Sequence, residues 1–116
     1  MKNKIISYKA FYSDLTCYGN FQYEIGKTYT TTNYIKCCIY GFHACPEPAA
    51  VFNYYNIYSS RFAIVEQSGI FDIDEDKICS SKIKIIRELS LQELIKYEIS
   101  WIDKNFNPLG TSTLIE

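Results

Sequence analysis

The strongest constraint on the fold is the strict alternation of charged and apolar residues in the sequence Lys-Ile-Lys-Ile at positions 82–85. Successive side chains of a β-strand point to opposite faces, so this pattern predicts a strand with buried isoleucines and solvent-facing lysines. The segment Phe-Gln-Tyr-Glu-Ile at 21–25 alternates in the same way. Further runs rich in aromatic and β-branched residues lie at 5–12, 28–32, 34–40, 61–66 and 70–73. We therefore expect the core to be built around a sheet.

Two helices are predicted. Pro46 and Pro48 are excluded from strand interiors but tolerated in the first turn of a helix, which predicts a short helix at about 48–55. Ser90 and Glu93 form a capping box, and a longer helix is expected over about 90–104. One apolar stripe of this helix is expected to face the core: Leu91, Leu94, Ile95, Ile99, Ile102 and Phe106. Residues 107–116 are interpreted as a tail.

Length and pattern together predict one α+β domain over residues 1–116, with a mixed or antiparallel sheet, one short mid-chain helix and one longer late helix. The net charge of −1 disfavours direct nucleic-acid binding, because phosphate neutralisation supplies most of the affinity of such proteins. No stretch approaches the roughly 18 apolar residues of a membrane span, and no export signal is evident. We therefore expect a cytoplasmic protein without membrane contacts, whose five cysteines remain thiols.

The only histidine of the chain lies in the sequence Tyr-Gly-Phe-His-Ala-Cys at 40–45. We interpret this stretch as a structural turn: Gly41 permits the turn, His43 bonds nearby backbone, and Cys45 packs as a small hydrophobe. Two chemical alternatives stay open. Cys37, His43 and Cys45 are candidate zinc ligands, since zinc prefers thiolate and imidazole. His43 and Cys45 are also a candidate base and nucleophile.

Several blocks of the sequence are similar to those of one domain family. They are Tyr-Lys-Ala-Phe at 8–11, Phe-Gln-Tyr-Glu-Ile-Gly-Lys-Thr-Tyr at 21–29, Gly-Phe-His-Ala-Cys at 41–45 and Ser-Arg-Phe-Ala at 60–63. Together they resemble an uncharacterised domain family that phages and prophages encode, over about residues 8–95. The resemblance implies a phage context and supplies no activity, so no catalytic residue is carried over.

The middle of the chain also resembles ADP-ribosyltransferases. Gly-Phe-His-Ala at 41–44 precedes the short helix expected at 48–55, and Arg-Phe-Ala-Ile-Val-Glu-Gln-Ser-Gly follows at 61–69. This resemblance implies a tyrosine, Tyr54 or Tyr55, stacked on the nicotinamide of NAD and Glu66 as the catalytic carboxylate. The early strand reads Tyr-Lys-Ala-Phe and lacks the histidine or arginine that grips the nucleotide in that class.

The function expected from these observations is binding to another protein. A chain with eleven tyrosines and no convincing catalytic set fits a small phage accessory protein, for example an inhibitor of a host defence such as CRISPR, in the cytoplasm of a bacterium. Its partner is expected to be a host or phage protein, and no cofactor is expected. The candidate contact residues are aromatic, as is typical of interface anchors: Tyr18, Tyr54, Tyr58 and Trp101. An ADP-ribosyltransferase-like enzyme or its inactive scaffold, and a zinc-stabilised recognition module, remain the alternatives.

Overall fold

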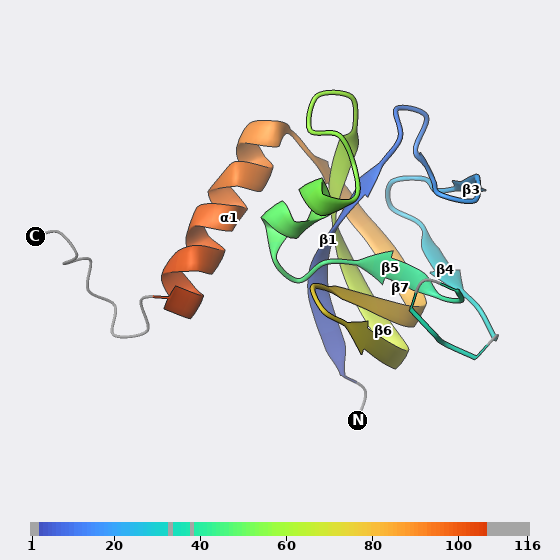
Figure 1. The fold of residues 1–116 in the computed structure, drawn as a ribbon. Coiled ribbons are helices and arrows are strands. Elements are labelled where there is room, and N and C mark those ends of the chain that lie inside the picture. Colours follow the sequence, from blue (N-terminus) through green and yellow to red (C-terminus); the bar gives the residue numbers. More distant parts are fainter. Residues whose placement is uncertain (1–2, 33, 38, 107–116) are drawn as a thin grey trace, which may run out of the picture.

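The computed structural model describes residues 3–32, 34–37 and 39–106. The chain runs through strands, one 3-10 helix and one α-helix (Figure 1). In chain order, the elements are β1 (Lys4–Phe11), β2 (Thr16–Cys17), β3 (Phe21–Gln22), β4 (Thr28–Thr30), β5 (Phe42–Ala44), η1 (Pro48–Asn53), β6 (Arg61–Asp74), β7 (Lys77–Leu89) and α1 (Leu91–Phe106).

The main sheet has five antiparallel strands in the order β1-β6-β7-β4, with β5 also paired to β7. β6 and β7 form a long hairpin whose register runs from Phe62 opposite Leu89 to Asp74 opposite Lys77. β4 and β5 share the other edge of β7, each along a different part of it. The α+β class, with an antiparallel sheet, a short mid-chain helix and a longer late helix, is therefore confirmed.

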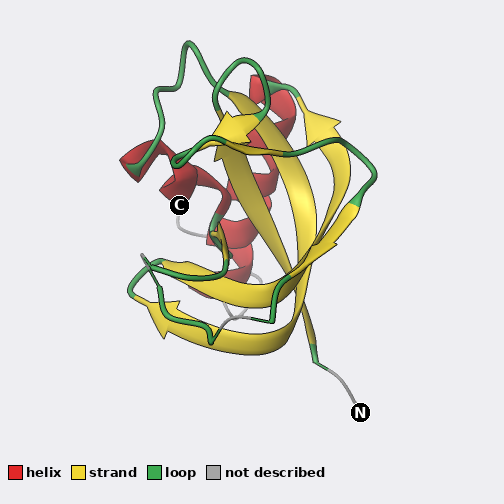
Figure 2. Ribbon diagram, turned by 90° about the vertical axis from the view of Figure 1, so that its right-hand side faces the viewer, coloured by secondary structure: helices red, strands yellow, loops and turns green. Residues whose placement is uncertain are grey.

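One backbone contact closes the sheet on itself. The Tyr8 N–H donates to the Cys45 carbonyl at 2.7 Å, and the Cys45 N–H donates to the Tyr8 carbonyl at 2.8 Å. Because Cys45 directly follows β5, this pairing joins β5 to β1. β1, β6, β7 and β5 thus form a ring of paired strands, which Figure 2 shows as a strongly curved sheet.

Two hydrophobic clusters pack against this ring. The first is formed by Phe11, Cys17, Tyr23, Phe42, Ala44, Ala63, Val65, Ile83 and Ile85. The second is formed by Tyr8, Ala10, Cys45, Ala50, Val51, Phe62, Leu89 and Leu94. Alternate residues of β1 enter different clusters, so both faces of this strand are buried near its end. Ile83 and Ile85 are fully buried between exposed lysines, as the alternation predicts.

Four expectations about the elements need correction. The alternating segment at 21–25 is a strand only at Phe21–Gln22, and of its apolar residues Tyr23 is buried while Phe21 and Ile25 are exposed. The run at 34–40 is not a strand in its described residues, because it turns back on itself with a bridge between Lys36 and Tyr40. The runs at 61–66 and 70–73 are parts of one strand, β6. The mid-chain helix is a 3-10 helix, Pro48–Asn53. The tail expected at 107–116 lies outside the described residues.

Helix α1 begins at the expected capping box. The Ser90 N–H donates to Glu93 Oε1 at 2.8 Å, and the Glu93 N–H donates to Ser90 Oγ at 3.1 Å. The N-terminal half of the helix packs through Leu94, which is 1% exposed, and Glu98 accepts the Ala49 N–H at 2.8 Å. The C-terminal half leaves the sheet (Figure 1). The expectation that the whole stripe is core is therefore wrong, since several of its members are exposed: Ile95, Ile99, Ile102 and Phe106.

Of the described helices, none has the length and hydrophobicity needed to cross a bilayer.

A glycine bulge divides the β6–β7 hairpin into two arms. The register shifts between Ser68 and Phe71, and Gly69 has a φ of 88°. The Ile70 N–H donates to Ser81 Oγ at 2.9 Å across the bulge. A Cβ at position 69 would lie 2.1 Å from Ser81 Oγ, so glycine is the residue that fits here without movement.

We expect Gly69→Ala to lower the free energy of unfolding by about 2–3 kcal/mol, from backbone strain and displacement of Ser81. Gly26→Ala is the matched control, because Gly26 has a φ of 90° and open space around its Cβ position. The loss in that control measures only the cost of placing alanine in the left-handed backbone conformation, about 1 kcal/mol. Urea unfolding measures both variants, and equal losses would contradict the role of the close contact at position 69.

Candidate functional site

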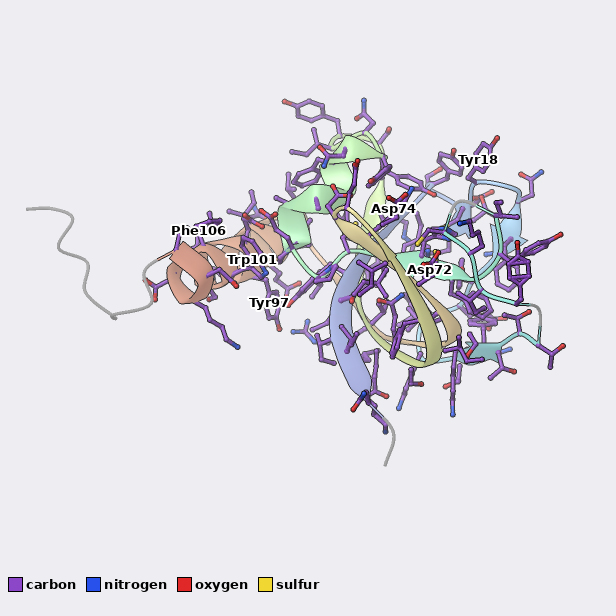
Figure 3. All side chains as sticks on the ribbon, turned by 60° about the horizontal axis from the view of Figure 1, so that its bottom comes forward. Tyr18, Asp72, Asp74, Tyr97, Trp101 and Phe106 are labelled. Atoms are coloured by element: carbon purple, nitrogen blue, oxygen red, sulfur yellow. The ribbon has the colours of Figure 1, made fainter. Side chains whose placement is uncertain are left out.

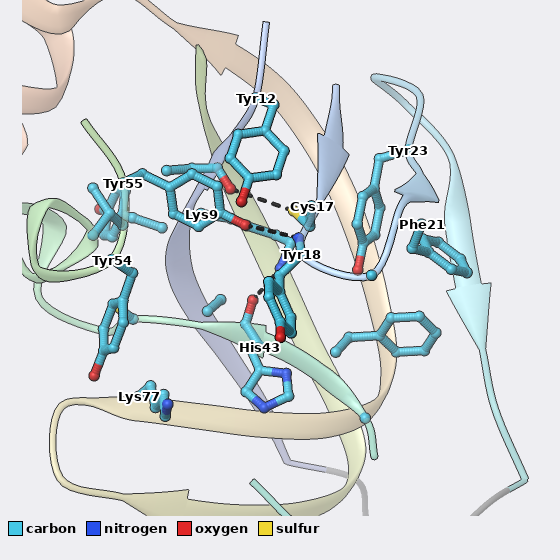
Figure 4. A pocket seen from close by; sticks show the side chains of 18 of the residues that line it. Lys9, Tyr12, Cys17, Tyr18, Phe21, Tyr23, His43, Tyr54, Tyr55 and Lys77 are labelled. Carbon is cyan, nitrogen blue, oxygen red and sulfur yellow. Dashed lines mark hydrogen bonds between the residues drawn. The ribbon is translucent and has the colours of Figure 1, made fainter. Parts of the chain in front are cut away.

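A pocket of about 650 Å³ opens between β1, the β2–β3 turn, β5 and the segment that follows η1 (Figure 4). This volume is typical of sites for small organic molecules. The walls are mainly aromatic: Tyr8, Tyr12, Tyr18, Phe21, Tyr23, Phe42, Tyr54 and Tyr55. Two lysines, Lys9 and Lys77, and His43 also line it, whereas no carboxylate does among the described residues. The charged side chains that line the pocket are therefore both lysines, and the Asp76 carboxylate lies just behind this lining, bonded to Tyr54.

Lys9 is a buried cation on β1. Its side chain is only 6% exposed, and its amine donates to the backbone carbonyl of His43 (Figure 4). The Lys9 Nζ lies 5.1 Å from the centroid of the Tyr23 ring, and no described carboxylate forms an ion pair with it. Burial lowers the pKa of Lys9, but Tyr23, Cys17 and Cys45 raise it by more, so that the net pKa lies above its usual value.

The second cation, Lys77, lies at the start of β7. Its Nζ is 4.7 Å from the centroid of the Tyr54 ring. The Tyr54 hydroxyl donates to Asp76, and this bond is the main cause that lowers the pKa of Asp76 and raises that of Tyr54. Asn53 Nδ2 donates to the same carboxylate at 2.7 Å. These bonds tie the end of η1 to the β6–β7 turn and hold this wall of the pocket in place.

His43 and Cys45 lie on the extended segment that begins with β5. Burial lowers the pKa of His43 to about 4, with further lowering by the charges of Lys9 and Lys77, against a hydrogen bond to the Gly41 backbone that raises it. Burial raises the pKa of Cys45 to about 12. At neutral pH the imidazole is uncharged and the Cys45 thiol is protonated, an arrangement that disfavours the base–nucleophile alternative.

The aromatic residues expected to contact a partner fall in different places. Tyr18 and Tyr54 line the pocket, whereas Tyr58 does not and is 90% exposed. Trp101 lies on α1 with its ring centroid 5.5 Å from that of Phe106. Figure 3 places Trp101 and Tyr18 at opposite ends of the molecule, so the four residues do not form one surface.

Glu66, the candidate carboxylate, is not among the residues that line the pocket. It forms an ion pair with Lys4, with Nζ and Oε1 3.8 Å apart. In the β1–β6 register, Glu66 lies opposite Ile6 and Ala63 lies opposite Lys9. Residues 63 and 66 of one strand point to opposite faces, so Glu66 points away from the face that carries Lys9. Tyr54 and Glu66 are therefore not brought together in this pocket.

In the set of candidate zinc ligands, the structure brings Cys79, in place of Cys45, next to Cys37 and His43. The ligand atoms of Cys37, His43 and Cys79 all lie within 4.8 Å of one another. Cys45 lies instead in the second hydrophobic cluster. Sequence reasoning missed Cys79 because it is brought to His43 only by the pairing of β5 with β7.

Sequence reasoning also missed both lysines of the pocket. Lys9 has a recognisable signal, because it is the only charged residue in the strand-forming run Ile-Ile-Ser-Tyr-Lys-Ala-Phe-Tyr at 5–12. A lone lysine in such a run marks a buried cation when both faces of the strand are covered. Lys77 follows an acidic turn and carries no comparable signal.

We expect Cys45 to resist alkylation in the folded protein. With a pKa of about 12, its thiol is ionised at pH 8 to about 1 part in 10⁴, against about one quarter for an ordinary exposed thiol. Iodoacetamide treatment of native protein at pH 8, followed by unfolding and a second, heavier reagent, measures this by peptide mass spectrometry. Labelling of Cys45 as fast as in urea would contradict the buried, protonated state.

No curated protein and no solved structure gave a match. A family model described as "Domain of unknown function (DUF7666)" matches residues 5–97, most of the chain. This match confirms the expectation of an uncharacterised domain family over about residues 8–95. The chain therefore belongs to the family of domains of unknown function DUF7666.

Proposed function

We propose that this domain binds a small organic anion in the pocket, with a phosphate or carboxylate group and a planar aromatic body. The observation that carries the proposal is Lys9, a buried amine in a pocket that no described carboxylate lines. A buried ammonium is costly unless an opposite charge or strong acceptors compensate it. The carbonyl of His43, a hydrogen bond with the Tyr23 hydroxyl and the faces of two aromatic rings supply part of that compensation, and none of them carries a full negative charge.

The anionic group is assigned to the Lys9 side of the pocket. An oxyanion next to Lys9 would accept a charge-assisted hydrogen bond, which is about twice as strong as a neutral one. Lys77 adds a second positive charge on the wall formed with Tyr54. His43 lines the same pocket, and because its imidazole is uncharged at neutral pH, it adds no further charge to the two lysines.

The planar body is assigned to the aromatic walls. Tyr54 and Tyr55 lie on one side of the pocket and Tyr23 lies on the other (Figure 4), and Tyr18 and Phe42 also line it. Such rings bind a planar ligand by stacking and edge-to-face contacts. The protonated Cys45 and the position of Glu66 outside the pocket favour binding over a reaction at either group.

We expect Lys9→Met to weaken the binding of AMP or of indole-3-carboxylate by at least tenfold, because the lost charge-assisted bond contributes about 1.5–3 kcal/mol. Titration calorimetry on the full chain measures the affinities, with adenosine as the uncharged comparison for AMP. NAD is tested as well, because Tyr54, the candidate to stack on its nicotinamide, lines the pocket. Methionine keeps the length and the apolar stem of lysine, so the variant preserves packing.

Lys27→Met is the matched control, because Lys27 is exposed and pairs with Glu24 at 3.2 Å. It should bind the anionic probes as the unmodified chain does. The proposal is wrong if neither the phosphate nor the carboxylate probe binds at millimolar concentration, or if Lys9→Met binds them as tightly as the unmodified chain.

We propose, as a second candidate, that the domain binds a partner protein through two loops that carry Tyr18 and Tyr58. Each of these tyrosines is 90% exposed. The loops are joined, since the Tyr18 N–H donates to the Tyr55 hydroxyl at 3.3 Å. Exposed aromatic residues are favoured anchors of protein interfaces. In the phage context that the sequence resemblance suggests, a bacterial defence component such as a CRISPR effector is the class of partner that fits.

We expect a photoreactive phenylalanine at position 58 to crosslink to one protein of defined mass in bacterial cells, and Tyr18→Ser to remove that adduct. Position 34 is the control, because Tyr34 is 65% exposed and lies on a different loop, with its ring against Tyr40. Gel analysis and mass spectrometry measure the yields. Equal crosslinking from positions 34 and 58 would count against this interface.

A further inference from the structure

We propose that Cys37, His43 and Cys79 form a zinc-binding site. One ligand atom of each residue, two sulfurs and one ring nitrogen, lies within 4.8 Å of the other two. Thiolate and imidazole are the ligands that Zn²⁺ prefers, at about 2.3 Å for sulfur and 2.0–2.1 Å for nitrogen. This inference does not depend on the proposed ligand of the pocket.

The strand register builds two of the three ligands into the sheet. His43 of β5 lies opposite Cys79 of β7, and Cys79 lies opposite Asp72 of β6. Residues directly opposite each other on paired strands share a face, with Cβ atoms about 4.5–5.5 Å apart. His43, Cys79 and Asp72 therefore form a row across three neighbouring strands, on rigid backbone.

The third ligand is brought to this row by the segment between β4 and β5. The Cys37 N–H donates to Asp72 Oδ2 at 2.8 Å, and Cys37 Sγ lies 3.1 Å from the Asp72 carbonyl oxygen. The turn itself is held by two backbone bonds between Lys36 and Tyr40, of 3.0 and 2.9 Å. Asp72 thus positions Cys37 over Cys79, as outer partners of metal ligands do.

The imidazole has the support that a metal-binding histidine needs. The Gly41 backbone lies within hydrogen-bonding reach of the ring. Histidines that bind zinc usually donate their second ring N–H to such a partner. A Cβ at Gly41 would lie 3.3 Å from Cys79 Cβ and 3.2 Å from the Ile35 side chain, so the glycine allows the turn to approach the site closely.

The two sulfurs leave two chemical states open, and zinc is the one that also uses the histidine. Cys37 Sγ and Cys79 Sγ are 2.6 Å apart, longer than the 2.03–2.05 Å of a disulfide bond. Around a tetrahedral zinc ion the two sulfurs would be about 3.8 Å apart, so the Cys37 turn moves outward by about 1 Å on binding. A disulfide would use the two cysteines alone, whereas a zinc ion would also bind the His43 ring, so the thiol state with zinc is proposed.

The test uses the full chain, freed of metal by a chelator and kept under reductant without oxygen. Cobalt(II) is added as a spectroscopic probe, and we expect sulfur-to-cobalt absorption and tetrahedral ligand-field bands that saturate at one equivalent. Zinc should then displace the cobalt. Cys37→Ser and Cys79→Ser should each weaken zinc binding at least tenfold in competition with a chelating dye, and Asp72→Asn should weaken it by about 10–100-fold.

Cys45→Ser is the matched control, because Cys45 is a buried cysteine two residues from His43 that packs in the second hydrophobic cluster, to which none of the three proposed ligands belongs. It should keep full affinity. If Cys79→Ser fails to fold, Cys37→Ala, on the turn, carries the same test. The proposal is overturned if cobalt gives no sulfur absorption, if Cys45→Ser loses affinity while Cys79→Ser keeps it, or if mass spectrometry finds a Cys37–Cys79 disulfide under reductant.

Discussion

The pairing of β6 with β7 is the constraint on which the rest of the structure depends. Every other strand of the main sheet pairs with one of these two. The bulge at Gly69 divides the hairpin into two arms: β4 lies on the arm nearer α1, and β5 lies on the arm nearer the β6–β7 turn. The pocket lies between the elements that this hairpin positions, and Lys77, next to the turn of the hairpin, is one of the two lysines that line it.

The pocket and the proposed zinc site meet at His43. The backbone carbonyl of this residue accepts the Lys9 amine, and its ring lies with the two sulfurs of Cys37 and Cys79. A change in the position of β5 would therefore alter the contacts of the Lys9 amine and also the distances from His43 to the two thiols. His43 therefore takes part in both candidate sites, through its backbone carbonyl in the pocket and through its ring in the proposed zinc site.

The sequence predicts secondary structure best where one face of an element is buried and the opposite face is exposed to solvent. The alternation of Ile83 and Ile85 with lysines correctly predicted a strand with one buried face. The capping box of Ser90 and Glu93 correctly predicted where the helix begins. The sequence predicts poorly where that contrast is absent. The run at 34–40 is apolar but forms a turn, because its bonds go to Asp72 and within itself instead of to a neighbouring strand. The roles of Lys9 and Cys79 depend on register, which pairs residues far apart in the sequence.

The backbone contact between Tyr8 and Cys45 has a consequence for the behaviour of the protein in solution. A strand at the border of an open sheet offers unsatisfied amide and carbonyl groups to other copies of the same chain, and this is a common route to aggregation. Here the middle of β1 is bonded on one side to β6 and on the other to Cys45. The middle of β1 is therefore not free to pair with a strand of another copy, and the exposed Lys4 lies nearer the beginning of the same strand.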